Sequence, residues 1–498
     1  MDIFQTLAGG VGQLADPMVW VMILIGTVFG VIAGALPGIG ATLGYGLVLP
    51  FTFVMSPEHA VAFLLSISVG VMYGNSIPAI LMGVPGNPSA VLTVIDGHTL
   101  FKRGEGSLAL GVAFVAALGA QFISILFFVV LVVPLTNLAY VFLAPELFAL
   151  LLLGMVAIVS LTGKNVLKGL LAAAFGLGIG IVGLDPINLT ARFDFGFRVI
   201  RSGFEIVPVV IGLLAVSELF RMTRQVYQWE NLSGVTKKNK FPPWSKLKPT
   251  IPAILGGTVV GTLVGAIPGA GATPAAMIAY QQAQLFSKHP EEFGNGSIEG
   301  IAANEAAQNA SNSGELIPTL ALGIPGSGSM VLLLSALTVH GFIPGPRMTE
   351  ARPELLYAAI AGLLAATLFL VLTGWWMASL MLKAVTLNRS GVIVFSLAVV
   401  ILGVFSLNGR IFDVAAMIVF GLIGYFMLRY GYSTAGAALA VVLGKLFEQN
   451  LRQGLSLTRN SWGEFFARPI TATVVAIAVI IFLIGIYRQF RLRQRMRG

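Results

Sequence analysis

Gly265-Ala-Ile-Pro-Gly-Ala-Gly-Ala-Thr273 is the segment from which the architecture of this chain is most directly inferred, together with Ile317-Pro-Thr-Leu-Ala-Leu-Gly-Ile-Pro-Gly-Ser-Gly-Ser329 behind it. Each phrase has an earlier copy. Gly34-Ala-Leu-Pro-Gly-Ile-Gly-Ala-Thr42 matches the first at seven of nine positions, and Ile77-Pro-Ala-Ile-Leu-Met-Gly-Val-Pro-Gly-Asn-Pro-Ser89 echoes the second. The offsets are 231 and 240 residues. Two phrases that recur in one order at nearly one offset indicate an internal duplication.

The composition indicates a membrane protein. Of 498 residues, 56% are hydrophobic and 10% are charged, whereas soluble domains carry about a quarter charged residues. Apolar runs of about 20 residues, enough to cross a bilayer as helix, recur from end to end and do not alternate as transmembrane strands do. We therefore expect an all-α polytopic membrane protein. The net charge of +9 does not favour a nucleic-acid partner, because the basic residues fall between the apolar runs.

The distribution of charge predicts the orientation of the chain in the lipid bilayer. Residues 1–101 contain no Lys or Arg, whereas the tail 488–498 contains five Arg and no acid. By the positive-inside rule the N-terminus lies on the periplasmic side and the tail in the cytoplasm. Residues 221–249 carry seven basic residues and one acid, which predicts a cytoplasmic linker.

This linker divides the chain into two halves. In the first, residues 1–220, we expect a hairpin and broken-helix region at 30–100 and scaffold helices at 107–220. In the second, residues 250–487, the corresponding regions are 261–346 and 355–487. Because a helix from outside enters the first copy and a helix from the cytoplasm enters the second, the repeats are predicted to have inverted topology. Inverted repeats with broken helices or re-entrant hairpins are typical of secondary transporters, with the site near the midplane.

Proline and glycine inside the repeated phrases predict helix breaks. Pro37 and Pro268 each remove a helix hydrogen bond, and the glycines after them permit φ angles that end one half-helix and begin another. A break leaves free N–H groups at the new start and free carbonyls at the old end, which can hold an anion and a cation such as Na⁺. One such break is explained equally well by close helix packing, but four in matched pairs favour a binding site. The turns concerned are residues 38–42, 85–89, 269–273 and 325–329.

A polar block, Asn304-Glu-Ala-Ala-Gln-Asn-Ala-Ser-Asn-Ser-Gly-Glu315, precedes the apolar run at Leu316. Asn304, Gln308, Asn312 and Glu315 fall on one face of a helix, with Glu305 and Asn309 beside it. The first copy is less polar here, with Ser66, Ser68, Tyr73, Asn75 and Ser76. We therefore expect an asymmetric site. Its predicted cation ligands are the carbonyl ends at Pro37 and Pro268, with Asn309, Asn312 and Glu315. The alternative is that residues 295–313 form an aqueous loop.

The scarcity of basic residues and the absence of catalytic motifs limit the possible kinds of site. Between Pro249 and Pro346 the only Lys or Arg is Lys288, so amides, hydroxyls and bound cations must meet the charge of a bound anion. This favours cation-coupled symport, with Thr42, Thr273, Ser327 and Ser329 as hydroxyl ligands. The chain has no Cys, no phosphate loop, no nucleophile elbow and no His-Glu-x-x-His helix. We expect neither an enzyme nor a cofactor beyond the coupling ion.

The repeated phrases and the Asn304–Glu315 block resemble the large membrane subunit of the bacterial tripartite tricarboxylate transporters over essentially the whole chain. The resemblance implies a multi-pass inner-membrane permease of elevator type that takes up a carboxylate, driven by an ion gradient that is usually Na⁺. It also implies two partners, a small membrane subunit of about four helices and a periplasmic substrate-binding protein.

Carried over to this chain, the resemblance implies a substrate site made of the two amide-rich turns and the second breaks. Its predicted residues are Gly38, Gly40, Thr42, Asn75, Gly86, Gly269, Gly271, Thr273, Gly326, Ser327 and Ser329. The first copy departs from the second at Asn87-Pro88, where the second has Ser327-Gly328, which leaves open whether both second breaks bind ligand. A stand-alone ion-coupled symporter and a channel or structural membrane scaffold remain as alternatives.

Overall fold

The part of the chain that the computed structural model describes is almost entirely helical. It covers all residues except 1–2, 37–39, 140, 163–165, 186–189, 224–240, 343–344, 346–350, 385–388 and 496–498. In these described residues seven helices are long and apolar enough to cross a membrane. One antiparallel ladder of two residues per strand pairs Gly183–Leu184 (β1) with Ala191–Arg192 (β2). The prediction of an all-α polytopic membrane protein is confirmed.

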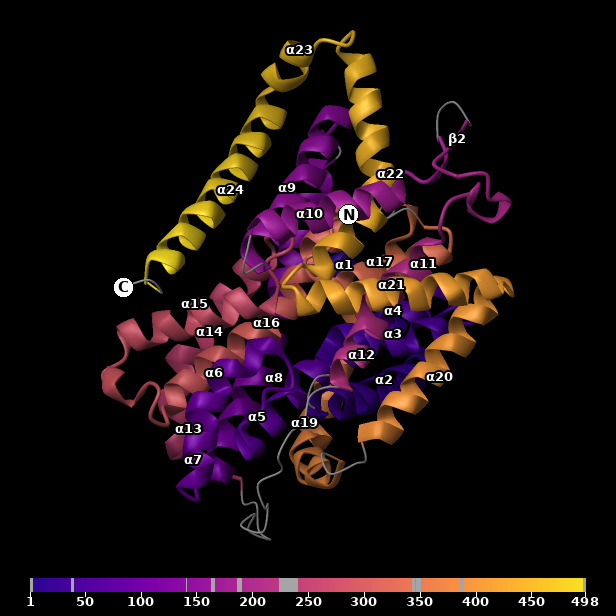
Figure 1. The fold of residues 1–498 in the computed structure, drawn as a ribbon. Helices are drawn as coiled ribbons and strands as arrows, with labels where there is room; N and C mark the ends of the chain where they lie inside the picture. Colours follow the sequence, from indigo (N-terminus) through magenta and orange to yellow (C-terminus); the bar gives the residue numbers. More distant parts are fainter. Residues whose placement is uncertain are drawn as a thin grey trace.

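The first half contains a run of helices before the 34-residue helix α8 (Gly106–Ala139) and a further run after it (Figure 1). The run before α8 is α1 (Ile3–Gln13), α2 (Pro17–Ala35), α3 (Gly40–Thr52), α4 (Pro57–Gly74), α5 (Ser76–Met82), η1 (Pro88–Ala90), α6 (Val91–Thr93), η2 (Val94–His98) and α7 (Thr99–Lys102). The elements that follow α8 are α9 (Ala144–Thr162), α10 (Val166–Gly180), η3 (Arg198–Ile200), α11 (Ile206–Ile211), η4 (Gly212–Val216) and α12 (Ser217–Met222).

The second half is also helical. Its first elements are α13 (Trp244–Leu247), η6 (Lys248–Thr250), α14 (Ile251–Gly265), α15 (Ala272–Phe286), η7 (Pro290–Glu292), α16 (Ile298–Leu322) and α17 (Gly328–Val339). They are followed by α19 (Pro353–Ala384), α20 (Arg389–Asn408), α21 (Ile411–Arg429), α22 (Thr434–Leu457), α23 (Trp462–Ala467) and α24 (Pro469–Arg495). Figure 1 shows α14 and α16 beside α8 of the first half, with α15 packed on α14 and α16.

Glycines let α2 pack closely against α4. A methyl carbon built on Gly30 would lie 2.3 Å from the carbonyl oxygen of Ile67, and one built on Gly34 would lie 2.5 Å from that of Val71. Such distances exclude any side chain, so these positions require glycine. Because four residues along α2 correspond to four residues along α4 in the same direction, the two helices run parallel.

The same arrangement recurs between α14 and α16. A methyl carbon on Gly261 would lie 2.3 Å from the carbonyl oxygen of Ala307, and one on Gly265 would lie 2.7 Å from that of Ser311. Gly261 and Gly265 stand 231 residues after the glycines of α2. The duplicated sequence therefore forms two similar pairs of parallel helices.

The α4–α5 helix pair and α16 run in opposite directions. Ser68 Oγ donates to Asn312 Oδ1 at 2.5 Å, whereas Ser76 Oγ, further along the chain, donates to Glu305 Oε2 at 2.5 Å, further back along α16. Since α2 is parallel to α4 and α14 is parallel to α16, α2 and α14 also run in opposite directions.

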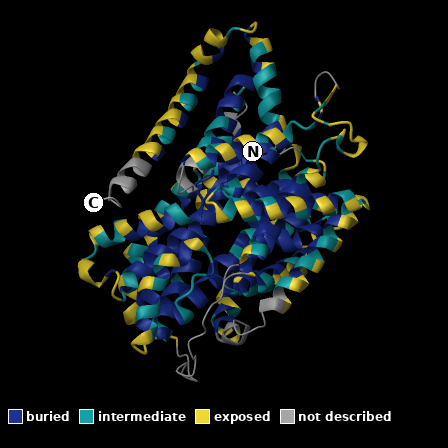
Figure 2. Ribbon diagram, in the orientation of Figure 1, coloured by how far each residue is buried: buried dark blue, intermediate teal, exposed yellow. Residues whose placement is uncertain are grey.

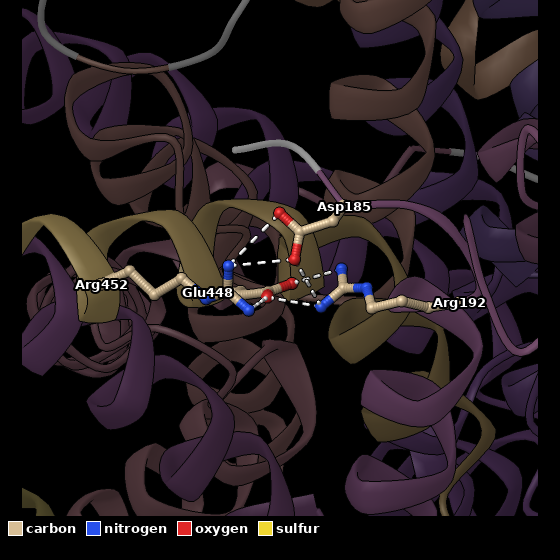
Figure 3. Close-up of polar contacts among 4 residues, drawn as sticks. All are labelled: Asp185, Arg192, Glu448 and Arg452. Atoms are coloured by element: carbon tan, nitrogen blue, oxygen red, sulfur yellow. Dashed lines mark hydrogen bonds and ion pairs between the residues drawn. The ribbon is translucent and has the colours of Figure 1, made fainter. Parts of the chain in front are cut away.

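Four charged side chains fasten the β1–β2 ladder to α22 (Figure 3). Arg192 contacts Glu448 at 2.8 Å and Asp185 at 3.4 Å, and Arg452 contacts Asp185 at 3.0 Å and Glu448 at 2.9 Å. The carboxylates of Asp185 and Glu448 are largely shielded from solvent. Each of them contacts two guanidinium groups, whose positive charge offsets the cost of burying it. The described residues of the segment 185–205 contain no membrane-spanning helix.

α24 is the least enclosed of the candidate membrane-spanning helices. Only 17% of the most apolar stretch of this helix is buried against the rest of the described chain. Figure 2 shows exposed residues along much of its length, whereas α16 is buried along nearly all of its length. Its exposed side chains include Ile480, Leu483 and Ile484. Such a surface suits contact with lipid or with another apolar helix.

Candidate functional site

The chain leaves helical geometry at both copies of the first phrase. Residues 266–271 separate α14 from α15, and Gly269 and Gly271 have φ angles of +77° and +69°. In the first copy α2 ends at Ala35 and α3 begins at Gly40, whose φ is +56°. L-residues rarely adopt such φ angles, so glycine is what permits these turns.

The second phrase is interrupted in the same way in both copies. α5 ends at Met82 and is followed by Gly83 with a φ of +67°, and α16 ends at Leu322 and is followed by Gly323 with a φ of +73°. In each case the glycine N–H donates a hydrogen bond to the carbonyl oxygen of a proline five residues earlier, Pro78 or Pro318. This is the left-handed helix end for which glycine is preferred. All four predicted breaks therefore occur.

Within each copy the two breaks lie against one another. A methyl carbon built on Gly40 would lie 3.9 Å from the carbonyl oxygen of Gly86. One built on Gly271 would lie 3.8 Å from Ser327 Cβ. The turns that are far apart in each copy of the sequence thus form one local structure.

The two copies also meet at their breaks. A methyl carbon on Gly328, at the start of α17, would lie 3.3 Å from Thr42 Oγ1 in the first turn of α3. Thr42, Ser327 and Gly328 are partly exposed, whereas Ser329 is buried. Since α3 and α17 both begin here, the N–H groups of two helix N-termini lie close together.

Glu315 lies between the breaks of the second copy. Its side chain is buried, and Oε2 accepts a hydrogen bond from Ser327 Oγ at 2.5 Å; Ser329 Oγ lies 2.9 Å from the same hydroxyl. Oε1 is 4.0 Å from the position of a methyl carbon on Gly271. In the first copy Asn75 stands 240 residues earlier. The two copies therefore present an acid and an amide at equivalent positions.

The polar face of α16 is enclosed by the protein. Its residues are each 2% exposed or less: Asn304, Glu305, Gln308, Asn309, Asn312 and Glu315. The alternative of an aqueous loop at 295–313 is therefore wrong, because α16 begins at Ile298 and its polar side chains meet polar groups of the first copy.

These contacts join the two halves. Asn312 accepts from Ser68, and Gln308 Oε1 accepts from Ser89 Oγ at 2.8 Å and Asn75 Nδ2 at 3.4 Å. Several buried atoms of this region have no hydrogen-bond partner within the described structure: Tyr45 Oη, Asn75 Oδ1, Asn304 Oδ1, Gln308 Nε2 and Asn312 Nδ2. Because buried polar groups are nearly always satisfied, unpaired atoms in one region indicate water or ligand binding.

The positions of the other residues predicted for the site are as follows. Asn309 donates Nδ2 to the main-chain oxygen of Glu305 at 2.9 Å, on its own helix. Pro268 lies in the turn after α14 and faces α9, 3.7 Å from a methyl carbon built on Gly154. Thr273 lies in the first turn of α15 and is partly exposed. Pro37 and Gly38 fall outside the described residues.

Sequence reasoning did not identify Tyr45 and Thr93. Thr93 Oγ1 donates to Glu305 Oε1 at 2.5 Å and accepts from Asn304 Nδ2 at 2.7 Å. Ser89 also contacts this face, and it stands 240 residues before Ser329, so the duplication contained that signal. No signal in the sequence distinguishes Thr93 or Tyr45 from other apolar-run residues.

The arrangement offers amides, hydroxyls and a carboxylate without a positive side chain. In the described structure Glu315 has no ion pair with Lys, Arg or His. Cavities of about 430 Å³, between α14 and α15, and about 710 Å³, between α9 and α22, lie away from the breaks. The chemistry at the breaks suits a hard cation at the carboxylate and an anion at the N–H groups.

Comparison with known proteins gives a consistent match. A family model described as the tripartite tricarboxylate transporter TctA family matches residues 20–439. An uncharacterized 52.8 kDa protein in the TAR-I ttuC' 3' region of Agrobacterium vitis is 33% identical over 494 residues, which is 99% of this chain and 98% of that protein. A protein in the TAR-II ttuC' 3' region of the same organism is 33% identical over 231 residues, 46% of this chain and 96% of the relative. No solved structure matches significantly.

Proposed function

Because this chain belongs to the tripartite tricarboxylate transporter TctA family, we propose that it is the permease subunit of a binding-protein-dependent secondary transporter in the bacterial inner membrane. The proposed substrate is a carboxylate of the tricarboxylate or dicarboxylate class, taken up with Na⁺. The proposed partners are a small four-helix membrane subunit and a periplasmic substrate-binding protein. The exposed apolar face of α24 is suitable for the small subunit or for lipid.

One observation carries this proposal: the two breaks of the second copy enclose the buried carboxylate of Glu315, with the start of α3 from the first copy against them, and none of the described Lys, Arg or His side chains pairs with it. A carboxylate substrate brings further negative charge to that region. Helix N-termini can hold an anion through their N–H groups, but a second carboxylate nearby repels it. A cation bound at Glu315 removes that repulsion, which would couple the two solutes. The substrate residues and the cation ligands that the sequence predicts stay in those roles as proposals.

The directions of the helices support inverted repeats. α2 and α14 are equivalent in the duplicated sequence and run in opposite directions, as shown by the contacts of Ser68 and Ser76 with α16. α14 follows the basic linker and so begins on the cytoplasmic side. α2 then begins on the periplasmic side, which agrees with a periplasmic N-terminus. We propose that the regions 30–100 and 261–346 form the moving part of an elevator-type transporter, with the longer helices as scaffold.

Reconstitution into proteoliposomes tests this function. We expect uptake of radiolabelled citrate or a dicarboxylate when the chain, the small subunit and the binding protein are combined and a Na⁺ gradient is imposed. Replacing the Na⁺ gradient by a K⁺ gradient is expected to abolish uptake. Full-rate uptake by the chain alone would show a stand-alone symporter, and non-saturable flux without coupling to an ion gradient would show a channel.

A further inference from the structure

The buried carboxylates of the described structure differ in the groups that they contact. They are Asp96, Glu146, Asp185, Glu305, Glu315 and Asp413. Glu146, Asp185 and Asp413 contact arginine. Asp96 accepts hydrogen bonds from three backbone N–H groups and from a tyrosine hydroxyl. In contrast, Glu305 accepts hydrogen bonds from the hydroxyls of Ser76 and Thr93, and Glu315 accepts one from the hydroxyl of Ser327.

Glu305 is held by residues outside the helix breaks. Oε2 accepts from Ser76 Oγ and Oε1 accepts from Thr93 Oγ1, each at 2.5 Å. Asn304 Nδ2 donates to Thr93 Oγ1 at 2.7 Å, and Asn304 Oδ1 has no partner. All four side chains are 1% exposed or less. Glu305 and Asn304 come from α16, Ser76 from α5 and Thr93 from α6, so both halves of the chain contribute.

The charge of this group is unbalanced. Ser76, Thr93 and Asn304 are neutral, and no Lys, Arg or His of the described residues forms an ion pair with Glu305. A buried ionised carboxylate is unfavourable unless a positive charge accompanies it, above all inside a membrane. Carboxylate, hydroxyl and amide oxygens are the ligands that hard cations prefer. One negative charge among neutral oxygens matches a monovalent cation.

The backbone beside Thr93 has an unusual conformation. Residues 94–98 (η2) form a π-helix directly after Thr93, and π-helical turns often accompany functional sites. Asp96 in this turn binds the N–H groups of Gly294, Gly296 and Ser297 at 2.9 to 3.1 Å, which fixes the turn against the start of α16. The hydroxyl of Thr93 is therefore held in place independently of Glu305.

We propose that Glu305, Ser76, Thr93 and Asn304 bind a sodium ion at a site separate from Glu315. The two carboxylates are ten residues apart on α16, about 15 Å along the helix axis. The inference deepens the proposed function and rests on it for the identity of the ion as Na⁺. An ion at Glu305 would tie α5 and α6 of the first copy to α16 of the second.

Direct sodium binding to the purified chain in detergent tests this site. Radioactive Na⁺ is titrated at constant ionic strength, with choline replacing Na⁺. We expect Glu305→Gln to bind one sodium ion fewer per chain than the wild type, and Glu315→Gln to lose a different single ion, so that the double variant loses both. Glu299→Gln is the matched control, because Glu299 lies in the first turn of the same helix and is only partly buried.

Two further variants keep the acid and test the site if Glu305→Gln fails to fold. Thr93→Val and Ser76→Ala are each expected to raise the half-saturating Na⁺ concentration by about tenfold or more. Thr258→Val is their control, because the Thr258 hydroxyl donates a hydrogen bond to the carbonyl oxygen of Ile254 within α14. Its Na⁺ affinity is expected to equal that of the wild type.

The outcomes separate this inference from the proposed function. If folded Glu305→Gln binds as much Na⁺ as the wild type while the complete transporter still takes up carboxylate with Na⁺, the Glu305 site is refuted and the function stands. If the wild type binds Na⁺ as expected but the complete transporter moves no carboxylate, the function is refuted and the site stands. Wild-type chain that binds no Na⁺, with uptake driven by protons, overturns both sodium assignments.

Discussion

Replacement of Gly271 by valine is the most direct test of the turns. Gly271 has a φ of +69° and a ψ of −177°, a conformation that is essentially restricted to glycine. The Cβ of the new side chain meets no clash, because it would lie 3.8 Å from Ser327 Cβ, an ordinary contact. The substitution therefore acts through backbone strain and leaves the neighbouring helices in place.

The strain sets the expected size of the effect. A non-glycine residue in such a conformation costs about 1–3 kcal/mol, and a β-branched residue lies toward the upper end. A shift of about 1–3 kcal/mol changes the population of the native turn by about 5- to 150-fold. If the N–H groups of this turn hold the substrate, uptake should fall by a factor in that range while the protein remains folded in the membrane.

The assay is carboxylate uptake by proteoliposomes that contain equal amounts of folded wild-type or variant chain with both partners. Gly104→Val is the matched control, because Gly104 has a φ of +83° and no atom within 4 Å of its added methyl carbon, in an exposed loop away from the breaks. We expect normal uptake in this control. Uptake by Gly271→Val within about twofold of the wild type would refute the role of the turn, since even about 1 kcal/mol of strain predicts more.

Three further changes have distinct expected results. Glu315→Gln should leave the chain folded but remove the dependence of uptake on the Na⁺ gradient; uptake that still rises with that gradient would contradict the coupling role. Gly261→Ala places a methyl carbon 2.3 Å from the carbonyl oxygen of Ala307 and should lower the free energy of unfolding by about 1–3 kcal/mol, which is measured as a lower melting temperature. Gly178→Ala is the control, because Gly178 has open space around it, and its melting temperature should equal that of the wild type. Asp96→Asn weakens the acceptor of three N–H groups and should lower the stability of the connection between α15 and α16 by about 2 kcal/mol or more. Greater sensitivity of this connection to protease is the expected result. Resistance equal to that of the wild type would argue against the anchoring role.

Local sequence was sufficient to predict the helix breaks. Proline removes a helix hydrogen bond and glycine permits positive φ angles, and neither effect depends on distant residues. Hence the interruptions before Gly40 and Ala272, and after Gly83 and Gly323, follow from the repeated phrases. The placement of the basic linker is only partly described, because residues 224–240 lie outside the described structure, and the division into domains stays a prediction.

Periodicity could not determine the environment of α16. A helix with Asn304, Gln308 and Asn312 on one face is compatible with water, protein or ligand on that side. The structure encloses this face with Ser68 and Thr93, among others, from segments more than 200 residues away in the chain. Hydroxyl side chains in apolar runs carry no mark of the partner that they will meet, so these contacts were not predictable.

The amino-acid order alone therefore established the membrane character, the duplication and the points at which helices are interrupted, because hydrophobicity and backbone preference are properties of short segments. For the described residues, the docking of α4 and α5 against α16 settled which carboxylates have no positive partner and which hydroxyls surround them. That outcome depends on how helices from the two halves pack together, where a side chain's charge balance is fixed by neighbours distant in the sequence rather than by its own segment.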